Sequence, residues 1–403
     1  MGTKNYDSAT DLITFSRASG GTFLGSNGLL QTAANNVPRI EYDATGAVKG
    51  LLIEEARTNL LTYSEDFSNA FWQKSECTAV LDATGPDGVT SAFTVTEAAT
   101  TFSHKLRDSS QTLTAVNYTQ SITAKYNGRH LQIRTSGEGG NYGLANFDLQ
   151  AGTVAKASGT GYVSSTIEDV GNGFYKCSLT VLNTIAGIGY DIGLSPTPAT
   201  DSDLVSYAGD GTSGIIVYGA QLEVGSFASS YIPTSGASAS RAADIASIPT
   251  SAFGYNAEGG TVVCDFNMSF DGTNYPRVWE IGSTINNQDR INVFGYAPTG
   301  TIGTGLFTAG VGQGGATLST GNTSPVGPLK AAFAWRENDL ASVQDGGTVQ
   351  TNSVATITGG NPRTVLALGG AADSNGDYMN GHIKSIRYYP RRLSNAQLQE
   401  LTT

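Results

Sequence analysis

Two carboxylates and one guanidinium stand close together in "LLIEEARTNLLTYSEDF", residues 51–67, in a chain of which only 14% of residues are charged. Paired carboxylates are the working groups of glycoside hydrolases, which hold them roughly 5 to 10 Å apart across the scissile bond. Glu54 and Glu55 are adjacent, and adjacent residues of a strand face opposite sides. They cannot address one bond, so we predict a structural joint in which Arg57 pairs with one glutamate.

A second polar motif, "DSNGD", sets Asp373, Asn375 and Asp377 at every second position. In a loop, this spacing can turn three oxygens toward one hard cation such as calcium. Calcium takes six to eight oxygens, and Tyr378 stands where the loop of an EF-hand would need glycine. We therefore expect no required cofactor, with calcium as a candidate ligand of this loop and a polar hairpin turn as the alternative.

Tyrosines are the third group of candidate residues, and the chain has 18 of them. Exposed aromatic faces stack on pyranose rings, with amides and carboxylates at the rim of the site. An amphipathic tyrosine can also close the end of a sandwich. The candidates that stand in glycine-rich loops are Tyr142, Tyr207, Tyr275 and Tyr296.

The sequence offers little support for other kinds of catalytic or cofactor-binding site. The three histidines, His104, His130 and His382, are isolated from one another in sequence and are interpreted as surface or rim residues. The "GVGQGG" stretch at 310–315 matches a dinucleotide-binding pattern, but no helix-forming sequence follows it. We predict a loop there.

Alternating acidic residues on a central strand would indicate a glycosidase of the concanavalin A-like kind. The nearest such pair is Glu41 with Asp43, which lies in the N-terminal region of the sequence. No catalytic residue is therefore predicted, and the chain is interpreted as a binding or structural protein rather than an enzyme.

The elements that must position these residues are strands. In "TVVCDFNMSF", apolar residues alternate with polar ones, as in a half-buried strand. Similar runs recur along the chain, with Asn-Gly, Asp-Gly and Pro-Asp-Gly turn signals between them. We predict an all-β fold of two antiparallel β-sandwiches, or jelly rolls, preceded by a short β-rich N-terminal segment. One helix is predicted at the C-terminus, with Ser394 as its N-cap and Gln397 three residues on.

Residues 225–247 are rich in Ser, Ala and Gly and lack sustained alternation, which predicts a domain boundary. The predicted units are 1–58, 59–240 and 250–403. Within them, Trp72 is expected in the core of the middle unit, and Trp279 and Trp335 in the core of the last.

Composition limits the partners. The net charge of −11 argues against nucleic acid, whose binding needs clustered Lys and Arg. No apolar run of membrane-spanning length occurs, and the N-terminus lacks the apolar core of a secretory signal. Three widely spaced cysteines make a poor disulfide framework, so free buried thiols are expected.

The stretch "FSRASGGTFLGSNGLLQTAANNVPRIEYDATGAVKGLLIEEARTNLLTYSEDFSNAFW", residues 15–72, resembles the opening of a recurrent module in tail-fibre and other virion surface proteins of tailed bacteriophages. "GPDGVTSAFTVTE", "EDVGNGFYKCSLTV" and "GAQLEVGSFASSYIPTSGASASRAAD" resemble later segments of that module. It is similar to carbohydrate-binding jelly rolls.

The last third resembles concanavalin A-like, laminin G-like lectin domains. The resemblance is carried by "GGTVVCDFNM", by "LKAAFAWRENDLASVQDGGTV" and by "NGHIKSIRYYPRRLSNAQLQEL".

These resemblances imply a virion structural protein, assembled in the host cytoplasm and carried on the virion surface as a tail or capsid fibre. It would act as an adhesin that binds host-surface polysaccharide without covalent chemistry. They also imply a homotrimer, other virion proteins as partners, and a docking or oligomerisation role for residues 1–58. A purely structural decoration protein and a capsule polysaccharide depolymerase are the alternatives.

Overall fold

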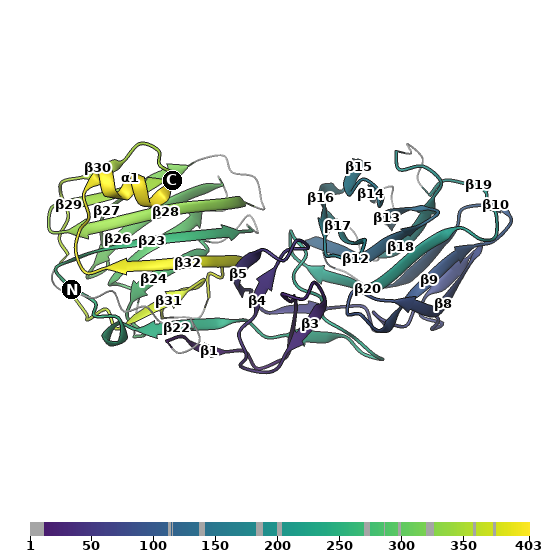
Figure 1. Cartoon of the computed structure of the whole chain (residues 1–403), viewed down its shortest axis with the longest axis horizontal. Helices are drawn as coiled ribbons and strands as arrows, with labels where there is room; N and C mark the ends of the chain where they lie inside the picture. Colours follow the sequence, from purple (N-terminus) through teal and green to yellow (C-terminus); the bar gives the residue numbers. More distant parts are fainter. Residues whose placement is uncertain are drawn as a thin grey trace.

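The computed structural model describes residues 12–403 except 112–113, 115, 137–141, 183–187, 200–203, 270–274, 286, 297–299, 320–325, 358–359 and 374–375. The described part forms two lobes, each built from two packed antiparallel sheets (Figure 1). The predicted all-β fold with two sandwiches is therefore confirmed. One α-helix, α1 (Asn395–Thr402), accompanies the strands, and no helix of the described part has the length and apolarity to cross a membrane.

The middle sandwich pairs two six-stranded sheets. One sheet has the order β15 (Thr153–Ser158), β14 (Tyr142–Asp148), β13 (His130–Ser136), β18 (Ile188–Ser195), β11 (Lys105–Gln111), β7 (Gln73–Ser75). The other has the order β16 (Tyr162–Asp169), β17 (Phe174–Leu182), β12 (Asn117–Asn127), β20 (Gly214–Val224), β9 (Thr90–Glu97), β8 (Cys77–Thr84). A small ribbon of β10 (Thr101–Phe102) and β19 (Tyr207–Ala208) lies at the far tip of this lobe (Figure 1).

The C-terminal sandwich pairs two seven-stranded sheets. The β24 sheet has the order β1 (Thr14–Ser16), β22 (Ile245–Pro249), β31 (Val365–Leu368), β24 (Arg277–Gly282), β25 (Arg290–Tyr296), β26 (Thr301–Thr308), β27 (Val311–Ser319). The β23 sheet has the order β30 (Gln350–Asn352), β29 (Asp339–Gln344), β28 (Val326–Arg336), β23 (Gly259–Met268), β32 (Gly381–Tyr389), β5 (Val48–Ile53), β4 (Ile40–Tyr42). A short 3₁₀ turn, η3 (Thr250–Ala252), follows β22.

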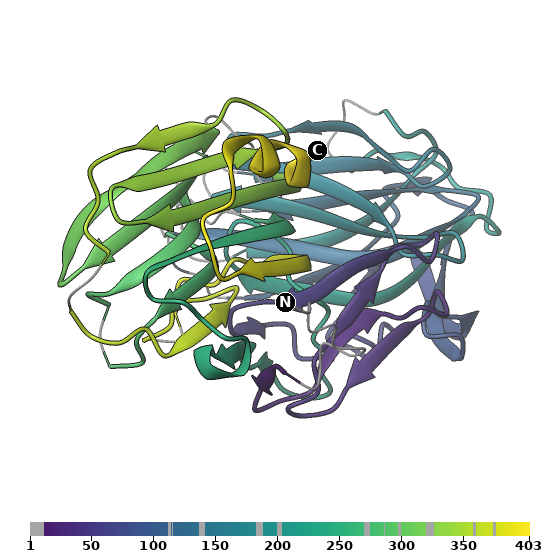
Figure 2. The ribbon, with the colours of Figure 1, turned by 60° about the vertical axis from the view of Figure 1, so that its left-hand side comes forward.

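The N-terminal segment does not form the separate unit that the sequence suggested. Strand β1 extends the β24 sheet, while β4 and β5 extend the β23 sheet. The hairpin of β2 (Gly21–Leu24) and β3 (Leu30–Ala33) reaches the middle sandwich, where Leu30 N donates to Pro86 O at 2.9 Å. In Figure 1 the purple strands of this segment lie between the lobes, and the turned view of Figure 2 shows them against both.

Along the sequence, the middle sandwich is therefore an insertion between two parts of the C-terminal sandwich. Strand β6 (Arg57–Asn59) carries the chain out, and β21 (Ala239–Arg241) pairs with it on the way back. The C-terminal sandwich resumes at β22, whose first residue is Ile245, a few residues before the predicted boundary. Within the segment 225–247, the side chains of Ser229, Tyr231 and Ile232 are buried.

Strand alternation sets the two cores. In β23 the side chains of Val262, Cys264, Phe266 and Met268 are all buried, as the sequence pattern predicted. The expected core positions of the three tryptophans are also confirmed: Trp72 lies in the middle core, Trp279 and Trp335 in the C-terminal one. All three cysteines are free and buried.

Helix α1 begins with the predicted capping box. The Ser394 side chain accepts from Gln397 N, and the Gln397 side chain accepts from Ser394 N. Leu398 is buried against β28 and β29, so the helix covers the outer face of the β23 sheet.

Candidate functional site

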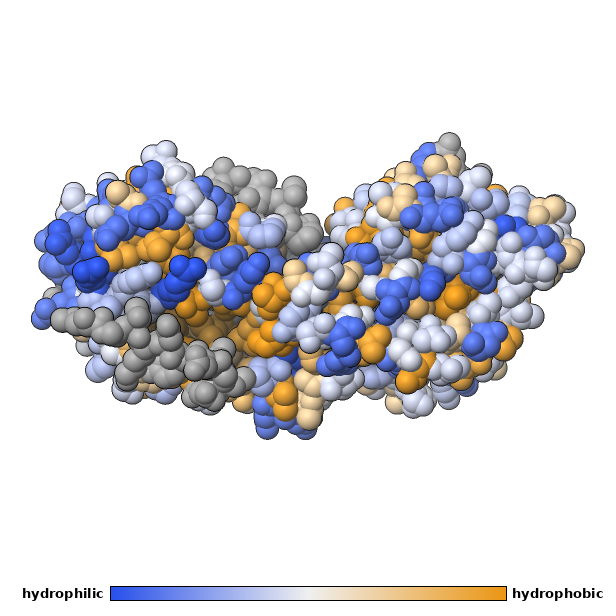
Figure 3. Space-filling model, viewed as in Figure 1, coloured by the Kyte–Doolittle hydropathy of each residue, from blue (hydrophilic) through white to orange (hydrophobic). Residues whose placement is uncertain are grey.

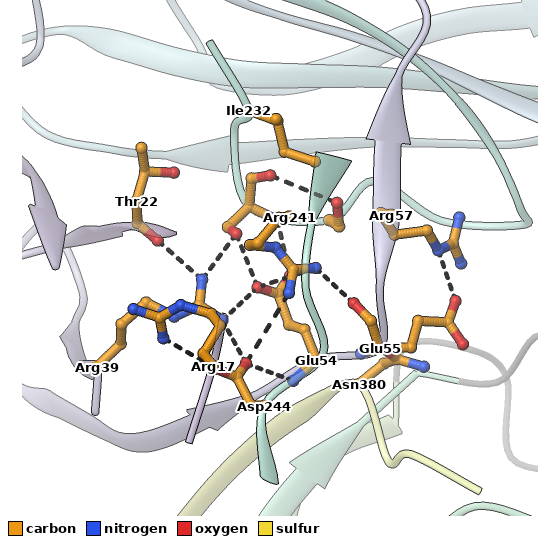
Figure 4. A network of polar contacts seen from close by, with 12 residues as sticks. Arg17, Thr22, Arg39, Glu54, Glu55, Arg57, Ile232, Arg241, Asp244 and Asn380 are labelled. Carbon is orange, nitrogen blue, oxygen red and sulfur yellow. Dashed lines mark hydrogen bonds and ion pairs between the residues drawn. The ribbon is translucent and has the colours of Figure 1, made fainter. Parts of the chain in front are cut away.

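The predicted joint is a buried ion network between the lobes (Figure 4). Asp244 accepts from Arg17 Nη1 at 2.9 Å and from Arg39 Nη2 at 2.5 Å. Glu54 lies 2.8 Å from Arg39 Nη2 and 3.5 Å from Arg241 Nη2. Burial alone would raise the pKa of Glu54, but Arg241 and Arg39 outweigh it and hold that pKa well below its usual range. The carboxylate is a fixed anion.

Glu54 and Glu55 lie in the link between β5 and β6 rather than inside a strand, and Glu55 contacts different partners from Glu54. The pairing expected for Arg57 is made here, with its Nε 2.5 Å from Glu55 Oε1. The Arg57 guanidinium also lies 4.7 Å from the Phe227 ring centroid. Glu55 N donates to Asn380 Oδ1 at 2.8 Å, which connects the joint to the segment before β32. Both glutamates serve structure, and neither is placed for acid–base catalysis.

A second series of charged side chains connects the two lobes. These contacts correct two interpretations of the sequence. Glu41, in β4, belongs to a sheet of the C-terminal sandwich, where its Oε2 lies 2.6 Å from His382 Nε2. Lys49 bridges Glu41 at 3.2 Å and Glu168 of the middle sandwich at 2.7 Å. Burial would raise the pKa of Glu41, but His382 and Lys49 lower it to about 2.

Glu41 therefore does not act with Asp43 as an acid pair. Asp43 is held in an exposed turn by hydrogen bonds from Thr45 and Ala47, and these lower its pKa. Nor are the histidines surface residues, because His104, His130 and His382 are all buried. The sequence could not show that these histidines are buried, because the partner of a buried histidine lies far from it along the chain.

Two of the predicted tyrosines lie apart from each other in the middle sandwich. Tyr142 is half-buried at the start of β14. Tyr207 lies on the ribbon at the tip, where its hydroxyl donates to Glu97 Oε2 at 2.5 Å. His104 packs against its ring with centroids 4.7 Å apart, and the Arg129 guanidinium lies 5.4 Å from the ring centroid. These contacts hold the Tyr207 ring in place and engage its hydroxyl in a hydrogen bond.

The other two tyrosines are brought together in the C-terminal sandwich. Tyr275 and Tyr296 stack with ring centroids 4.8 Å apart and planes inclined by 23°. Alternation along β25 buries Val293 and turns Tyr296 to the outer face of the β24 sheet. Gly295 N donates to Pro276 O at 2.8 Å, which holds the segment before β24 beside β25. Tyr275 is 47% exposed, so the stacked pair presents an aromatic face to solvent.

Arg277 connects this tyrosine pair to the predicted calcium loop. Its Nη1 donates to Tyr275 O at 2.7 Å, and its Nη2 lies 3.5 Å from Asp377 Oδ2. The backbone joins them as well, because Arg277 N donates to Asp377 O at 2.8 Å. Two motifs that lie about a hundred residues apart in the sequence thus converge at one end of the β24 sheet. Asn375, the middle residue of the predicted calcium set, lies outside the described residues.

Glu280 is a site residue that the sequence analysis missed. It is only 1% exposed, and its carboxylate accepts from Arg277 Nε, Asn292 Nδ2 and Ala372 N at 3.1, 3.0 and 3.1 Å. The Glu280 carboxylate is therefore buried beneath these donors and is not accessible to a substrate. The period-two alternation with buried Trp279 and Ile281 would place Glu280 on the outer face, but it does not predict the loop that covers it.

The acidic groups here do not form a catalytic pair. Burial raises the pKa of Asp377, and Glu280 and Asp373 add to this rise, while Arg277 opposes it. Arg277 lies between Asp377 and Glu280 as a structural bridge. Among the described residues, no three His, Cys, Asp or Glu side chains are grouped as metal ligands. Calcium at Asp373 and Asp377 stays a prediction.

A small pocket lies on the other side of this loop. Its volume is about 90 Å³, well below the roughly 300–1,000 Å³ of most small-molecule sites. Ser247, Thr284, Ala371 and Tyr378 contribute to its lining. This pocket is therefore too small to enclose a ligand of sugar size. On the face in Figure 3, hydrophilic residues are spread over both lobes, and hydrophobic residues are visible near the hollow between them.

No protein-family model matches the chain, and no curated protein matches it. Among solved structures, it is similar to the CBM40 domain of a Ruminococcus gnavus IT-sialidase, with 16% identity and a TM-score of 0.32 over 37% of this chain and 84% of that one. It is also similar to a SAP-like pentraxin from Limulus polyphemus, with 13% identity and a TM-score of 0.29 over 36% and 70% of the two chains.

The mouse laminin α1 domains LG4-5 have 10% identity and a TM-score of 0.26 over 74% of this chain and 88% of that one. At this level of similarity, the likeness extends to β-sandwich architecture alone. The chemistry of the site has to be argued from its own residues.

Proposed function

We propose that this protein binds a surface glycan without covalent chemistry, through the stacked Tyr275–Tyr296 pair on the outer face of the β24 sheet. The stacked pair is the observation that carries the proposal, because an exposed tyrosine face matches the apolar face of a sugar ring. Asp377, whose side chain is 34% exposed, supplies a carboxylate acceptor nearby and is held there by the buried Arg277.

The binding strength of such a site comes from repetition. A shallow aromatic surface contacts one side of a sugar, so each copy binds weakly, and several copies on one particle raise the avidity. The sequence resemblance to phage virion surface proteins supports a fibre or adhesin on the tail or the capsid. A trimer and contacts with other virion proteins belong to the same proposal.

The test is a glycan array probed with the intact protein and two variants. Tyr275→Ala removes the exposed ring, so binding is expected to fall at least tenfold because the stacking contact is lost. The matched control is Tyr162→Ala, which removes an exposed tyrosine from β16 of the middle sandwich and should leave binding unchanged. Equal binding by the wild type and Tyr275→Ala would end the proposal for this site.

Three further measurements separate the alternatives. Release of reducing ends from host capsule would indicate a depolymerase instead. A melting temperature that stays the same with chelator and with added calcium would contradict the calcium prediction. Light scattering at micromolar concentration distinguishes a trimer from a monomer.

A purely structural role is the second candidate, and the joint favours it. The buried ion network and the Lys49 bridge hold two sandwiches in one arrangement, as a spacer in a fibre or a decoration of a capsid would require. Absence of binding to every glycan and to host cells, with normal incorporation into virions, would support this role over adhesion.

A further inference from the structure

The stacked tyrosines are one end of a longer line of aromatic rings. Tyr275 also lies against Phe294, with centroids 6.4 Å apart. Phe294 and Phe307 meet above Gly305, where an added Cβ would lie 3.6 Å from the first ring and 3.3 Å from the second. The aromatic row, defined as Tyr296, Tyr275, Phe294 and Phe307, therefore extends along the paired strands β25 and β26.

Glycines let these rings lie close to the sheet. Phe294 is the cross-strand partner of Gly303, and a Cβ at that glycine would lie 3.3 Å from the Phe294 ring. At Gly305, a Cβ would come within 2.9 Å of Asn292 Oδ1. Glycine inside a strand marks a place where another group approaches the backbone closely. Here the approaching groups are the two phenylalanine rings, so the row lies low along the sheet.

Two arginines accompany the phenylalanines. The Arg290 guanidinium lies 3.6 Å from the centroid of Phe307, and that of Arg277 lies 5.5 Å from the centroid of Phe294. Arg290 Nη1 donates to Asn287 O, and Arg290 Nε lies 4.0 Å from Glu280. A stacked guanidinium is flat and carries its N–H donors around its edge, which suits hydroxyl groups beside a ring. The far end of the row is thus both aromatic and hydrogen-bonding.

The charges along the row offset one another. Glu280 and Asp377 face the two arginines, and Asp373 adds a further carboxylate nearby. The described residues of this surface therefore carry no excess of positive charge that would select an acidic sugar. Their chemistry fits uncharged sugar units with hydroxyl groups.

We propose that the aromatic row is an extended saccharide site, which takes a linear chain of several uncharged sugar units rather than one terminal sugar. This inference rests on the proposed function and deepens it. The row follows β25 from Arg290 to Tyr296, a span of roughly 20 Å at about 3.3 Å per residue. One sugar ring would cover the tyrosine end, and the following units would reach Phe307 and Arg290.

The experiment measures binding of the full chain to immobilised linear glucans, galactans and mannans of one to six units, with sialylated and uronic-acid glycans on the same array. Binding to at least one uncharged series is expected to rise at least tenfold between one and four units. Phe307→Ala and Arg290→Gln should each reduce binding of the four-unit glycan toward that of the two-unit glycan. Tyr275→Ala should weaken binding at every length.

Arg336→Gln is the matched control, since the Arg336 side chain is 64% exposed on the other sheet, and it should change nothing. Arg290→Gln guards against misfolding of Phe307→Ala, and thermal melting is recorded for both. Binding that is independent of length, or confined to acidic glycans, or unaffected by both far-end variants overturns the inference. If Tyr275→Ala still abolishes binding, the proposed function survives that result. No binding to any glycan overturns both.

Discussion

Individual residues at the junction show why carboxylates close in sequence do not make a catalytic site. Asp244 has no exposed side-chain surface, and two arginines together with Glu54 N donate to it. The oxygens of this carboxylate are bound by buried donors and are not exposed to solvent. A glycosidase needs the opposite arrangement, with one carboxyl kept protonated and reachable by substrate.

We expect Asp244→Asn to lower the free energy of unfolding by about 3–5 kcal/mol, because it leaves buried arginines without their counter-charge. Chemical denaturation with urea measures this loss. Asp82→Asn, at an exposed position of β8, is the control and should cost less than about 1 kcal/mol. A small effect at Asp244 would mean that the network stabilises the junction little.

Among the elements, β5 depends on a glycine for its place beside β32. Gly50 has φ of +127°, a backbone conformation that side-chain-bearing residues rarely adopt. A Cβ there would lie 2.4 Å from Ile383 O, in the strand that β5 joins. The register of β4 on β5 also shifts next to this position, between Glu41 and Tyr42. The glycine therefore permits close approach of the N-terminal strand to the sheet.

Gly50→Ala is accordingly expected to destabilise the protein by at least about 2 kcal/mol, through strain and a backbone clash. The melting temperature should fall by several degrees. Gly327→Ala serves as the control, since nothing lies within 4 Å of a Cβ at that glycine. Equal melting of both variants would show that β5 can shift without cost.

For the whole molecule, the decisive feature is that residues 12–58 belong to both lobes. Their strands extend both sheets of the C-terminal sandwich, their hairpin contacts the middle sandwich, and Arg17 and Arg39 complete the joint. The two sandwiches therefore share a segment, and unfolding of either sandwich would break contacts that this segment makes with it. Any docking role of this segment has to be compatible with its strands being paired.

The full chain is expected to unfold in one calorimetric transition, with equal calorimetric and van't Hoff enthalpies, because the shared segment couples the lobes. Differential scanning calorimetry measures this. A chain that starts at residue 59 should melt at a much lower temperature or aggregate, since β22 and β32 would then expose their edges. Two resolved transitions for the full chain would contradict the coupling.

Local patterns in the sequence were sufficient for much of this fold. Alternation identified β23 and its buried face, turn signals separated the strands, and the Ser394–Gln397 box located the helix. Each of these properties depends on residues a few positions apart, where backbone geometry alone decides which side chains share a face. The tyrosine candidates and the DSNGD loop were also recognisable by residue type.

Which segments become neighbours was decided only by tertiary structure. No local pattern pairs β5 with β32, joins Glu41 to His382, or separates Tyr142 and Tyr207 from the Tyr275–Tyr296 stack. Alternation says which face a side chain occupies, while the choice of partner strand follows from burying both faces of every sheet at once. For that reason the sequence determined the two sandwiches and their candidate residues, and packing over hundreds of residues determined the site.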